Sequence, residues 1–351
     1  MKTSTEDGRG LWPLKAALGF LAAVAAVVVL RELRAIFIPF CFAVFLYFLF
    51  GGAVRRLLAW RVPKALALAG VLAAIFCGLS ICGMMLFAGA ATFVDLFPAY
   101  SARAVALVEG GLARVHLPFV DLRQYLAHID WESLLDPGRV TALVTGSIGS
   151  FAGFLGNLLL VLLLLMFLLA ERTPMAERVA RSLTPAQAGG LRAVMNEVDA
   201  RVRHYLLIKT LMSAATAALA ALILLAGGAD FVVFTALLVF FLNYIPTFGS
   251  LLSTLFPALA AFLKFGFSPR FVLLTLGLMA MQFLMGNVLE PQVMGHRLNL
   301  SPIVILLALV FWGWMWGAAG MFLAVPVTSS VRIVFESLPA LRPLAAAMGG
   351  E

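Results

Sequence analysis

Polar residues recur at four-residue spacing within an apolar stretch near the end of the chain. Gln282, Gly286 and Glu290 would share one helix face, with Asn287 beside them. Ionisable and amide groups at membrane depth are costly unless they face protein or water, so they indicate a transport path. Glu290 is the candidate for coupling to a proton or cation, because a partly buried carboxylate can have a raised pKa. The alternative is an interfacial Glu290 that caps the helix and pairs with Arg297.

A second group of candidate residues interrupts the uncharged run 231–263. The octet NYIPTFGS, residues 243–250, separates two apolar halves that are each too short to cross about 30 Å of hydrocarbon. Non-helical backbone at membrane depth is tolerated only where it is buried in protein or lines a watery cavity. The pattern favours a re-entrant hairpin with its tip at a cavity, and the alternative is two short tilted helices that turn at the membrane surface. The candidate pathway residues of the octet are Asn243, Tyr244, Pro246, Thr247 and Gly249.

The run 298–331 resembles a second copy of this segment. An offset of 71 positions places 238–241 (LVFF) on 309–312 (LVFW), and Gly249 on Gly320. Paired interrupted segments of opposite orientation are typical of inverted-repeat transporters with a midplane substrate site. The single run 271–289 separates the two copies, so they are expected to enter the membrane from opposite sides. The breakers of the second copy are Gly313, Gly317, Gly320 and Pro326.

The composition is that of an integral membrane protein. Of 351 residues, 63% are hydrophobic and 12% are charged, and the mean hydropathy is +1.05. We therefore predict an all-α polytopic membrane protein with about six full transmembrane helices and two interrupted, re-entrant hairpins, an inverted repeat in the C-terminal half, and amphipathic helices outside the bilayer. The uncharged runs are 16–30, 35–54, 65–94, 140–170, 210–229, 231–263, 271–289 and 298–331.

Charged residues predict how the chain is oriented. The loop with Arg55, Arg56, Arg61 and Lys64 carries no acid, and the segment 171–209 is also basic, so both are expected in the cytoplasm. The acidic segment 95–139 is expected outside, which places both termini in the cytoplasm. The net charge of +8 then indicates contact with lipid headgroups, and no nucleic-acid partner is expected.

The same reasoning divides the chain into segments. The expected order is N-terminal transmembrane helices 1–3 (1–93), an external amphipathic segment (94–146), transmembrane helix 4 (147–170), a cytoplasmic amphipathic helix (171–209), a transport core with both hairpins (210–337) and a cytoplasmic tail (338–351).

Several function classes lack the residues that they require. The four histidines are scattered, so an enzyme is not expected, and no Gly-rich phosphate loop is present to support a nucleotide-driven pump. Transport would then draw on a proton, sodium or substrate gradient, without a cofactor or metal. An oligomeric channel or a membrane scaffold remains an alternative. The three cysteines, Cys41, Cys77 and Cys82, are expected to be buried thiols.

Three motifs in the last 150 residues, FLNYIPTFGS, NVLEPQVMGHRLNLSP and WGAAGMFLAVP, resemble the autoinducer-2 exporter (AI-2E) family. The resemblance implies an oligomeric permease of the bacterial inner membrane that exports small molecules such as the quorum-sensing signal autoinducer-2. Some relatives are described instead as sodium or proton antiporters. By motif position, the functional core would be Asn243, Pro246, Gly249, Glu290, Pro291, Gly295, Gly317, Gly320 and Pro326.

Overall fold

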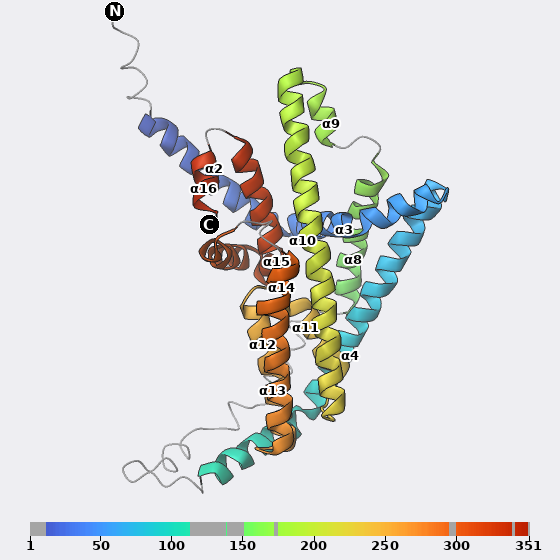
Figure 1. The fold of residues 1–351 in the computed structure, drawn as a ribbon, viewed down its shortest axis with the longest axis vertical. Helices are drawn as coiled ribbons and strands as arrows, with labels where there is room; N and C mark the ends of the chain where they lie inside the picture. Colours follow the sequence, from blue (N-terminus) through green and yellow to red (C-terminus); the bar gives the residue numbers. More distant parts are fainter. Residues whose placement is uncertain are drawn as a thin grey trace, which may run out of the picture.

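The structure is a computed structural model that describes residues 12–112, 138, 151–171, 175–294, 300–338 and 341–349. All named elements in these ranges are helices (Figure 1). They are α2 (Trp12–Glu32), α3 (Arg34–Ala59), α4 (Lys64–Leu112), α8 (Phe151–Ala170), α9 (Met175–Ala180), α10 (Pro185–Ala226), α11 (Val232–Leu242), α12 (Phe248–Phe265), α13 (Pro269–Phe283), the π-helix η1 (Leu284–Leu289), α14 (Glu290–Met294), α15 (Pro302–Ser337) and α16 (Arg342–Ala347).

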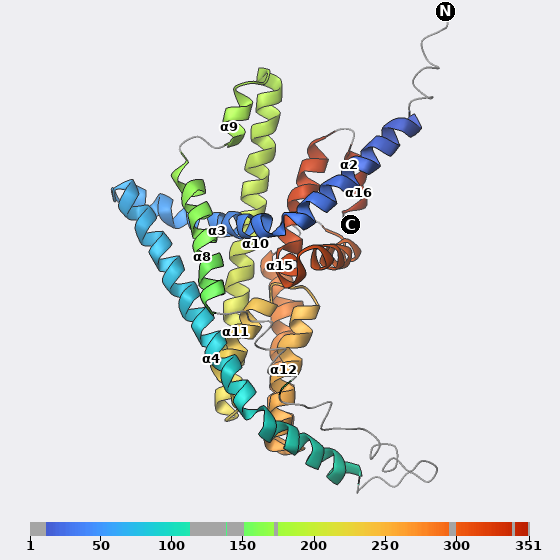
Figure 2. The same ribbon diagram turned by 180° about the vertical axis from the view of Figure 1, so that it is seen from behind.

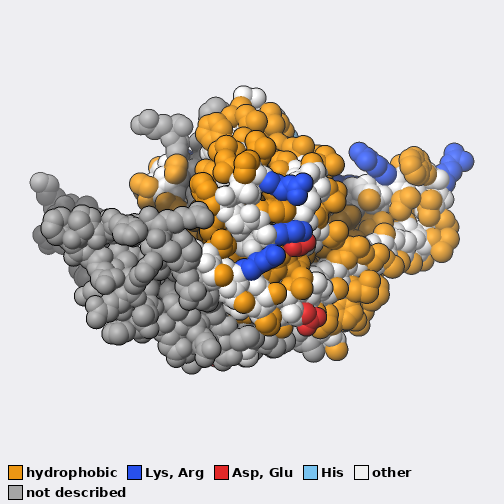
Figure 3. Space-filling model, turned by 90° about the horizontal axis from the view of Figure 1, so that it is seen from below, with side chains coloured by type: hydrophobic (Ala, Val, Ile, Leu, Met, Phe, Trp, Pro, Cys, Tyr) orange, Lys and Arg blue, Asp and Glu red, His pale blue; other side chains and the backbone are white. Residues whose placement is uncertain are grey.

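Seven of the described helices are long and apolar enough to cross a membrane, and α11 is a shorter apolar helix. The chain is therefore a multi-pass, all-α membrane protein, as predicted. Seen from the end where α13 begins, the described surface is largely hydrophobic, with a small group of charged side chains (Figure 3). Large exposed hydrophobic side chains along the spanning helices, such as Leu211 and Leu222 of α10, suit contact with lipid.

Two helices are much longer than one span. α4 has 49 residues and α10 has 42, so each extends over about 60 to 75 Å at 1.5 Å per residue. The run 65–94 and the first part of the segment 95–139 therefore form one helix. Most of the segment 171–209 likewise joins the run 210–229, because α10 begins at Pro185. The earlier part of that segment contains α9. Residues 113–137 and 139–150 lie outside the described part of the chain.

Local sequence explains where two of the core helices begin. Thr184 is the N-cap of α10, Pro185 occupies its first turn, and the Thr184 N–H donates to Oε1 of Gln187 at 3.3 Å. Ser268 caps α13, where its hydroxyl oxygen accepts from the Phe271 N–H at 3.3 Å. Both caps place a helix start beside a connection, and α10 and α13 then run through the centre of the molecule (Figure 1).

Both predicted interrupted segments are helical hairpins. Hairpin 1 consists of α11, a turn at 243–247, and α12. Hairpin 2 is α15, which reverses at Gly317 with φ 63° and ψ −143°. Its two arms pack through Leu309 and Ala324, and the Trp312 indole N–H donates to the Thr328 hydroxyl at 3.0 Å. Of the four breakers predicted for hairpin 2, only Gly317 marks the reversal, whereas Gly313, Gly320 and Pro326 lie within its helical arms.

The hairpins approach the middle of α10 from opposite ends. At the base of hairpin 1, Lys264 pairs with Asp230 at 2.5 Å, close to the C-terminal end of α10. At the base of hairpin 2, Glu336 lies 3.8 Å from Arg201 in the N-terminal half of α10. The tip of hairpin 1 contacts the middle of α10, where Tyr244 bonds to Thr210 at 2.6 Å. This opposed arrangement is visible in both ribbon views (Figures 1 and 2) and agrees with the expected inversion.

Asp230 ties the base of hairpin 1 to α4, because its carboxylate also accepts a 2.7 Å hydrogen bond from Tyr100. Partial burial raises the pKa of Asp230, but the hydrogen bonds from Lys264 and Tyr100 outweigh it, so the pKa lies below the ordinary value. A lowered folded-state pKa adds stability above the unfolded value of about 3.9, and that stability is lost as the pH falls through the folded value.

Asp230→Asn is therefore expected to lower the thermal midpoint of the detergent-purified protein near pH 7, by the equivalent of about 1 kcal/mol or less because the pair is part-exposed. The gap from wild type should close below about pH 4. Thermal unfolding at a series of pH values measures this difference in thermal midpoint. Asp95→Asn is the control, because the Asp95 side chain is exposed. A difference in thermal midpoint that stays constant with pH would show that the Asp230–Lys264 pair contributes no pH-dependent stability.

Gly249 and Gly320 serve close packing of the hairpin arms and not backbone freedom. A Cβ at Gly249 would collide with the carbonyl oxygen of Leu242, and one at Gly320 with that of Trp312. Both glycines have ordinary helical φ values and allow the arms of each hairpin to approach closely. The positive φ at the tips belongs instead to Thr247 (60°) and Gly317 (63°).

The expectation for the cysteines is wrong for Cys77, which is exposed, whereas Cys41 and Cys82 are half-buried. An apolar run does not require burial in protein, because the outer face of a membrane helix can contact lipid.

Candidate functional site

A cavity of about 840 Å³ lies where the tip of hairpin 1 meets α10, the α13–η1–α14 helix and the start of hairpin 2. Its lining combines amides, hydroxyls, one acid and one base with apolar side chains. This composition suits a small polar ligand with an apolar side. The polar lining residues are Tyr205, Lys209, Asn243, Thr247, Ser250, Thr254, Gln282, Asn287 and Glu290.

Among the described lining residues, one ion pair supplies both charges. Lys209 of α10 is 4% exposed and its ammonium contacts the carboxylate of Glu290, whose side chain is 17% exposed. Because the charges are opposite and adjacent, the cavity carries no net charge from these groups. The sequence offered Arg297 as a partner of Glu290, but Arg297 lies outside the described residues; the partner that the structure describes is Lys209.

Sequence reasoning missed Lys209, although one signal was present. It is the last charged residue before the apolar run 210–229, where a membrane-edge residue is the usual interpretation. Because α10 continues without interruption, Lys209 is adjacent to Thr210 and one turn before Ser213, and both of these contact the tip of hairpin 1. The position of Lys209 at the cavity therefore depends both on the continuity of α10 and on the packing of hairpin 1 against it.

Asn243 is held at the tip of hairpin 1 by a direct hydrogen bond. It is 6% exposed, and its amide donates to the Ser213 hydroxyl at 3.1 Å. Breaking this bond would leave a buried amide without its partner, which costs about 1 to 3 kcal/mol. The neighbouring Pro246 and Thr247 also line the cavity. This part of the octet is therefore placed as the sequence predicts.

A π-helical turn arranges the opposite wall. η1 continues α13, and the Glu290 N–H bonds to the carbonyl of Met285, five residues earlier. A π-helix is rare and occurs frequently at functional sites. Gln282, Gly286, Asn287 and Glu290 all line the cavity across this turn. The residues predicted to share a polar face therefore do share one wall of the cavity, and the π turn lies within that wall.

Tyr244 joins the two hairpins and does not line the cavity. Its ring stacks on Phe322 of hairpin 2 with centroids 4.4 Å apart, and it is 3% exposed. Its hydroxyl bonds to Thr210. The side chain thus fixes both hairpins to α10 at one point.

Five of the other predicted pathway residues are described and do not line the cavity. Pro291 is exposed, and Gly295 lies outside the described residues. Gly249, Gly317, Gly320 and Pro326 are absent from the lining. The tip of hairpin 2 points elsewhere because Trp316 donates from its indole to the carbonyl of Leu30 at 3.1 Å. Hairpin 2 contributes Pro302, Ile305 and Val325 to the cavity instead.

Within the described ranges, no group of three or more His, Cys, Asp or Glu side chains is placed to hold a metal ion. The groups that are present recognise ligands by hydrogen bonding. Amides and hydroxyls offer both donors and acceptors, and the ion pair offers one of each sign.

Comparison with known proteins decides the family. The model of the AI-2E family transporters matches residues 18–340. The chain belongs to this family. It is therefore a membrane transporter, as the motifs predict, and is not an enzyme.

Named relatives agree with this assignment. A transport protein of Haemophilus influenzae is 29% identical over 337 residues, 95% of each chain. The AI-2 transport protein TqsA of Escherichia coli is 30% identical over 310 residues, which cover 88% of this chain and 87% of TqsA. The transport protein YhhT of Escherichia coli is 32% identical over 238 residues, 66% of this chain and 65% of YhhT.

Proposed function

We propose that this AI-2E family member is a secondary transporter that exports a small polar solute, such as autoinducer-2 or a related metabolite, from a bacterial cell. The observation that carries the proposal is the cavity between two opposed hairpins and α10, lined by amides and hydroxyls. The charged groups among its described lining residues, Lys209 and Glu290, neutralise each other, which favours an uncharged solute over an ion. The name of TqsA adds support for an autoinducer-2-like substrate.

The proposed mechanism is alternating access. The two hairpins with the α13–α14 helix form a mobile unit that rocks against the N-terminal helices. In doing so it exposes the cavity to one side and then to the other. A proton or sodium gradient provides the energy through Glu290, whose contact with Lys209 must change when an ion or the solute binds.

The proposed setting is the bacterial inner membrane, with both termini in the cytoplasm. Basic residues where α3 and α4 meet, Arg61 in the connection and Lys64 at the start of α4, support this orientation. The end of the molecule with α9 then faces the cytoplasm, and the end where α13 begins faces outward. We further propose that the protein is a homo-oligomer and that its export activity serves quorum sensing.

A sodium or proton antiporter is the second candidate. The observation that favours it is the buried Lys209–Glu290 pair, because a carboxylate within a membrane transporter is a typical ion-binding group. In that case the ions themselves are the cargo. A channel or scaffold would use the same helices without saturable flux.

The experiment that tests the proposal is untargeted metabolite profiling of medium and cytosol. Cells lacking the protein are compared with cells that carry wild type or Glu290→Gln at matched membrane levels. We expect a small solute to accumulate inside without the protein and to leave with wild type only. Unchanged metabolites, together with sodium or proton flux in vesicles, would replace this proposal with the antiporter.

A further inference from the structure

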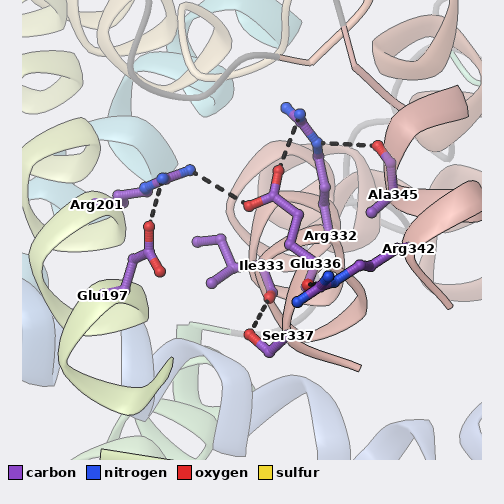
Figure 4. A network of polar contacts seen from close by, with 8 residues as sticks. All are labelled: Glu197, Arg201, Arg332, Ile333, Glu336, Ser337, Arg342 and Ala345. Atoms are coloured by element: carbon purple, nitrogen blue, oxygen red, sulfur yellow. Dashed lines mark hydrogen bonds and ion pairs between the residues drawn. The ribbon is translucent and has the colours of Figure 1, made fainter. Parts of the chain in front are cut away.

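The last described segment of the chain, residues 341–349, folds back onto the base of hairpin 2 (Figure 4). It contains α16 and lies within the segment 338–351, for which the sequence predicts a cytoplasmic tail. The Ser301 N–H donates to the carbonyl of Met348 at 3.1 Å. Leu300 and Gly349 form an antiparallel bridge. The segment is thereby attached to the residues that lead into α15, and we call residues 341–349 the C-terminal clamp.

The C-terminal clamp also holds the other end of hairpin 2. Arg332, near the end of α15, has a side chain that is 7% exposed. Its Nε donates to the carbonyl of Ala345 at 3.3 Å, and its Nη2 lies 3.0 Å from Glu336. A buried guanidinium needs such partners, since an unpaired buried charge is strongly destabilising. Both ends of hairpin 2 are therefore joined through the clamp.

One ion pair connects this assembly to α10. Glu336 lies 3.0 Å from Arg332 but 3.8 Å from Arg201, which also contacts Glu197 (Figure 4). The tighter contacts are those within hairpin 2 and the clamp. Displacement of hairpin 2 relative to α10 would break the Arg201 contact and leave the Arg332 contacts intact.

The clamp lies next to the cavity wall. Leu300, which bridges to Gly349, lines the cavity, as do Pro302 and Ile305 at the start of hairpin 2. Leu300 and Ser301, which lead into Pro302, would lose their backbone connections to the clamp if the clamp were released. The position of this wall thus depends on a segment that contributes no side chain to the cavity.

We propose that the C-terminal clamp controls access to the cavity from the α9 end, by holding the two ends of hairpin 2 together, with Arg332 as its positioning residue. In the clamped state the Leu300 wall is fixed and that entrance is narrow. Release of the clamp lets the start of hairpin 2 move away from α14. The inference rests on the proposed transport role of this cavity.

Thiol labelling tests the clamp without any solute. Ser250, which lines the cavity, is replaced by cysteine in a protein with Cys41, Cys77 and Cys82 changed to alanine. A membrane-impermeant maleimide is applied to inside-out vesicles and, separately, to spheroplasts. Removal of all residues after Leu338 is expected to raise the labelling rate from the α9 end by at least about fivefold, with no change from the other end, as a shift towards an open state predicts.

A second variant tests the clamp without truncation. Cysteines at Leu300 and Gly349 replace a cross-strand pair, whose Cα separation of about 4.5 to 5.5 Å allows a disulfide. Oxidation of these vesicles is expected to slow labelling of Ser250→Cys, and a reductant should restore it. Arg332→Gln should behave like the truncation, and Arg332→Lys should restore part of the wild-type rate.

An unchanged labelling rate in the truncated and the cross-linked proteins would overturn the proposal. Equal increases in labelling rate from both sides of the membrane would also overturn it, because they indicate that the whole structure has become less rigid. These outcomes are independent of the metabolite experiment. Export of a solute can fail while the labelling result holds, and in that case only the assigned cargo is wrong. If labelling fails while export holds, only the clamp is wrong.

Discussion

Lys209→Met and Glu290→Gln, made singly, are each expected to abolish solute export and to lower the free energy of unfolding by about 3 kcal/mol. Each change leaves the other group of the buried pair without its counter-charge. The value lies at the lower end of the range for buried pairs because the Glu290 side chain retains 17% exposure. Thermal unfolding in detergent measures stability, and export from intact cells measures transport.

The double variant Lys209→Met with Glu290→Gln separates these effects. It removes both charges, so its stability should return close to wild type while export stays lost. Glu177→Gln is the matched control, since Glu177 of α9 forms an exposed ion pair with Arg192 of α10. It is expected to leave export unchanged. Stability losses that simply add in the double variant would show that Lys209 and Glu290 do not interact.

Gly249→Ala is expected to destabilise the protein by about 3 kcal/mol or more and to reduce its amount in the membrane. The new Cβ would overlap the Leu242 carbonyl oxygen, a backbone atom that cannot rotate away. Relief requires the two arms of hairpin 1 to separate, which also displaces Asn243 from Ser213. Gly320→Ala should act similarly on hairpin 2, through the carbonyl of Trp312.

Gly70→Ala is the control for these changes. Gly70 lies within α4, and a Cβ there would meet no atom within 4 Å. Alanine favours the helix over glycine by about 1 kcal/mol, so Gly70→Ala should be neutral or slightly stabilising. Membrane levels and thermal midpoints measured in parallel compare the two sites. Equal behaviour of Gly249→Ala and Gly70→Ala would contradict the close approach at the hairpin tip.

The sequence was most informative where it broke a regular pattern. Pro246 and Gly249 interrupt an apolar run, and this local signal predicts a reversal wherever the segment lies in the fold. The four-residue spacing of Gln282 and Glu290 similarly predicts a shared face, which the structure confirms. Both predictions need only helix geometry and the cost of polar groups in lipid.

Features that depend on contacts between distant segments could not be predicted in this way. Lys209 and Glu290 are 81 positions apart, and only the packing of α10 against α14 brings them together. A local partner such as Arg297 is the natural sequence-based choice. The π turn of η1 has no strong marker in its residues, and the helices α4 and α10 continue past the charge changes that were used as boundaries. Charge follows the membrane surface, whereas a helix ends only at a breaker or a cap.

The most direct measurement of the central claim is solute export after filling the cavity. Thr254 lines the cavity, and Leu255, one residue later on α12, is 55% exposed on the outer surface. Thr254→Trp and Leu255→Trp are compared in cells at matched membrane levels. We predict that Thr254→Trp stops export, because the indole occupies the space of the solute, and that Leu255→Trp exports as wild type does. Full export by Thr254→Trp would show that the solute takes another path.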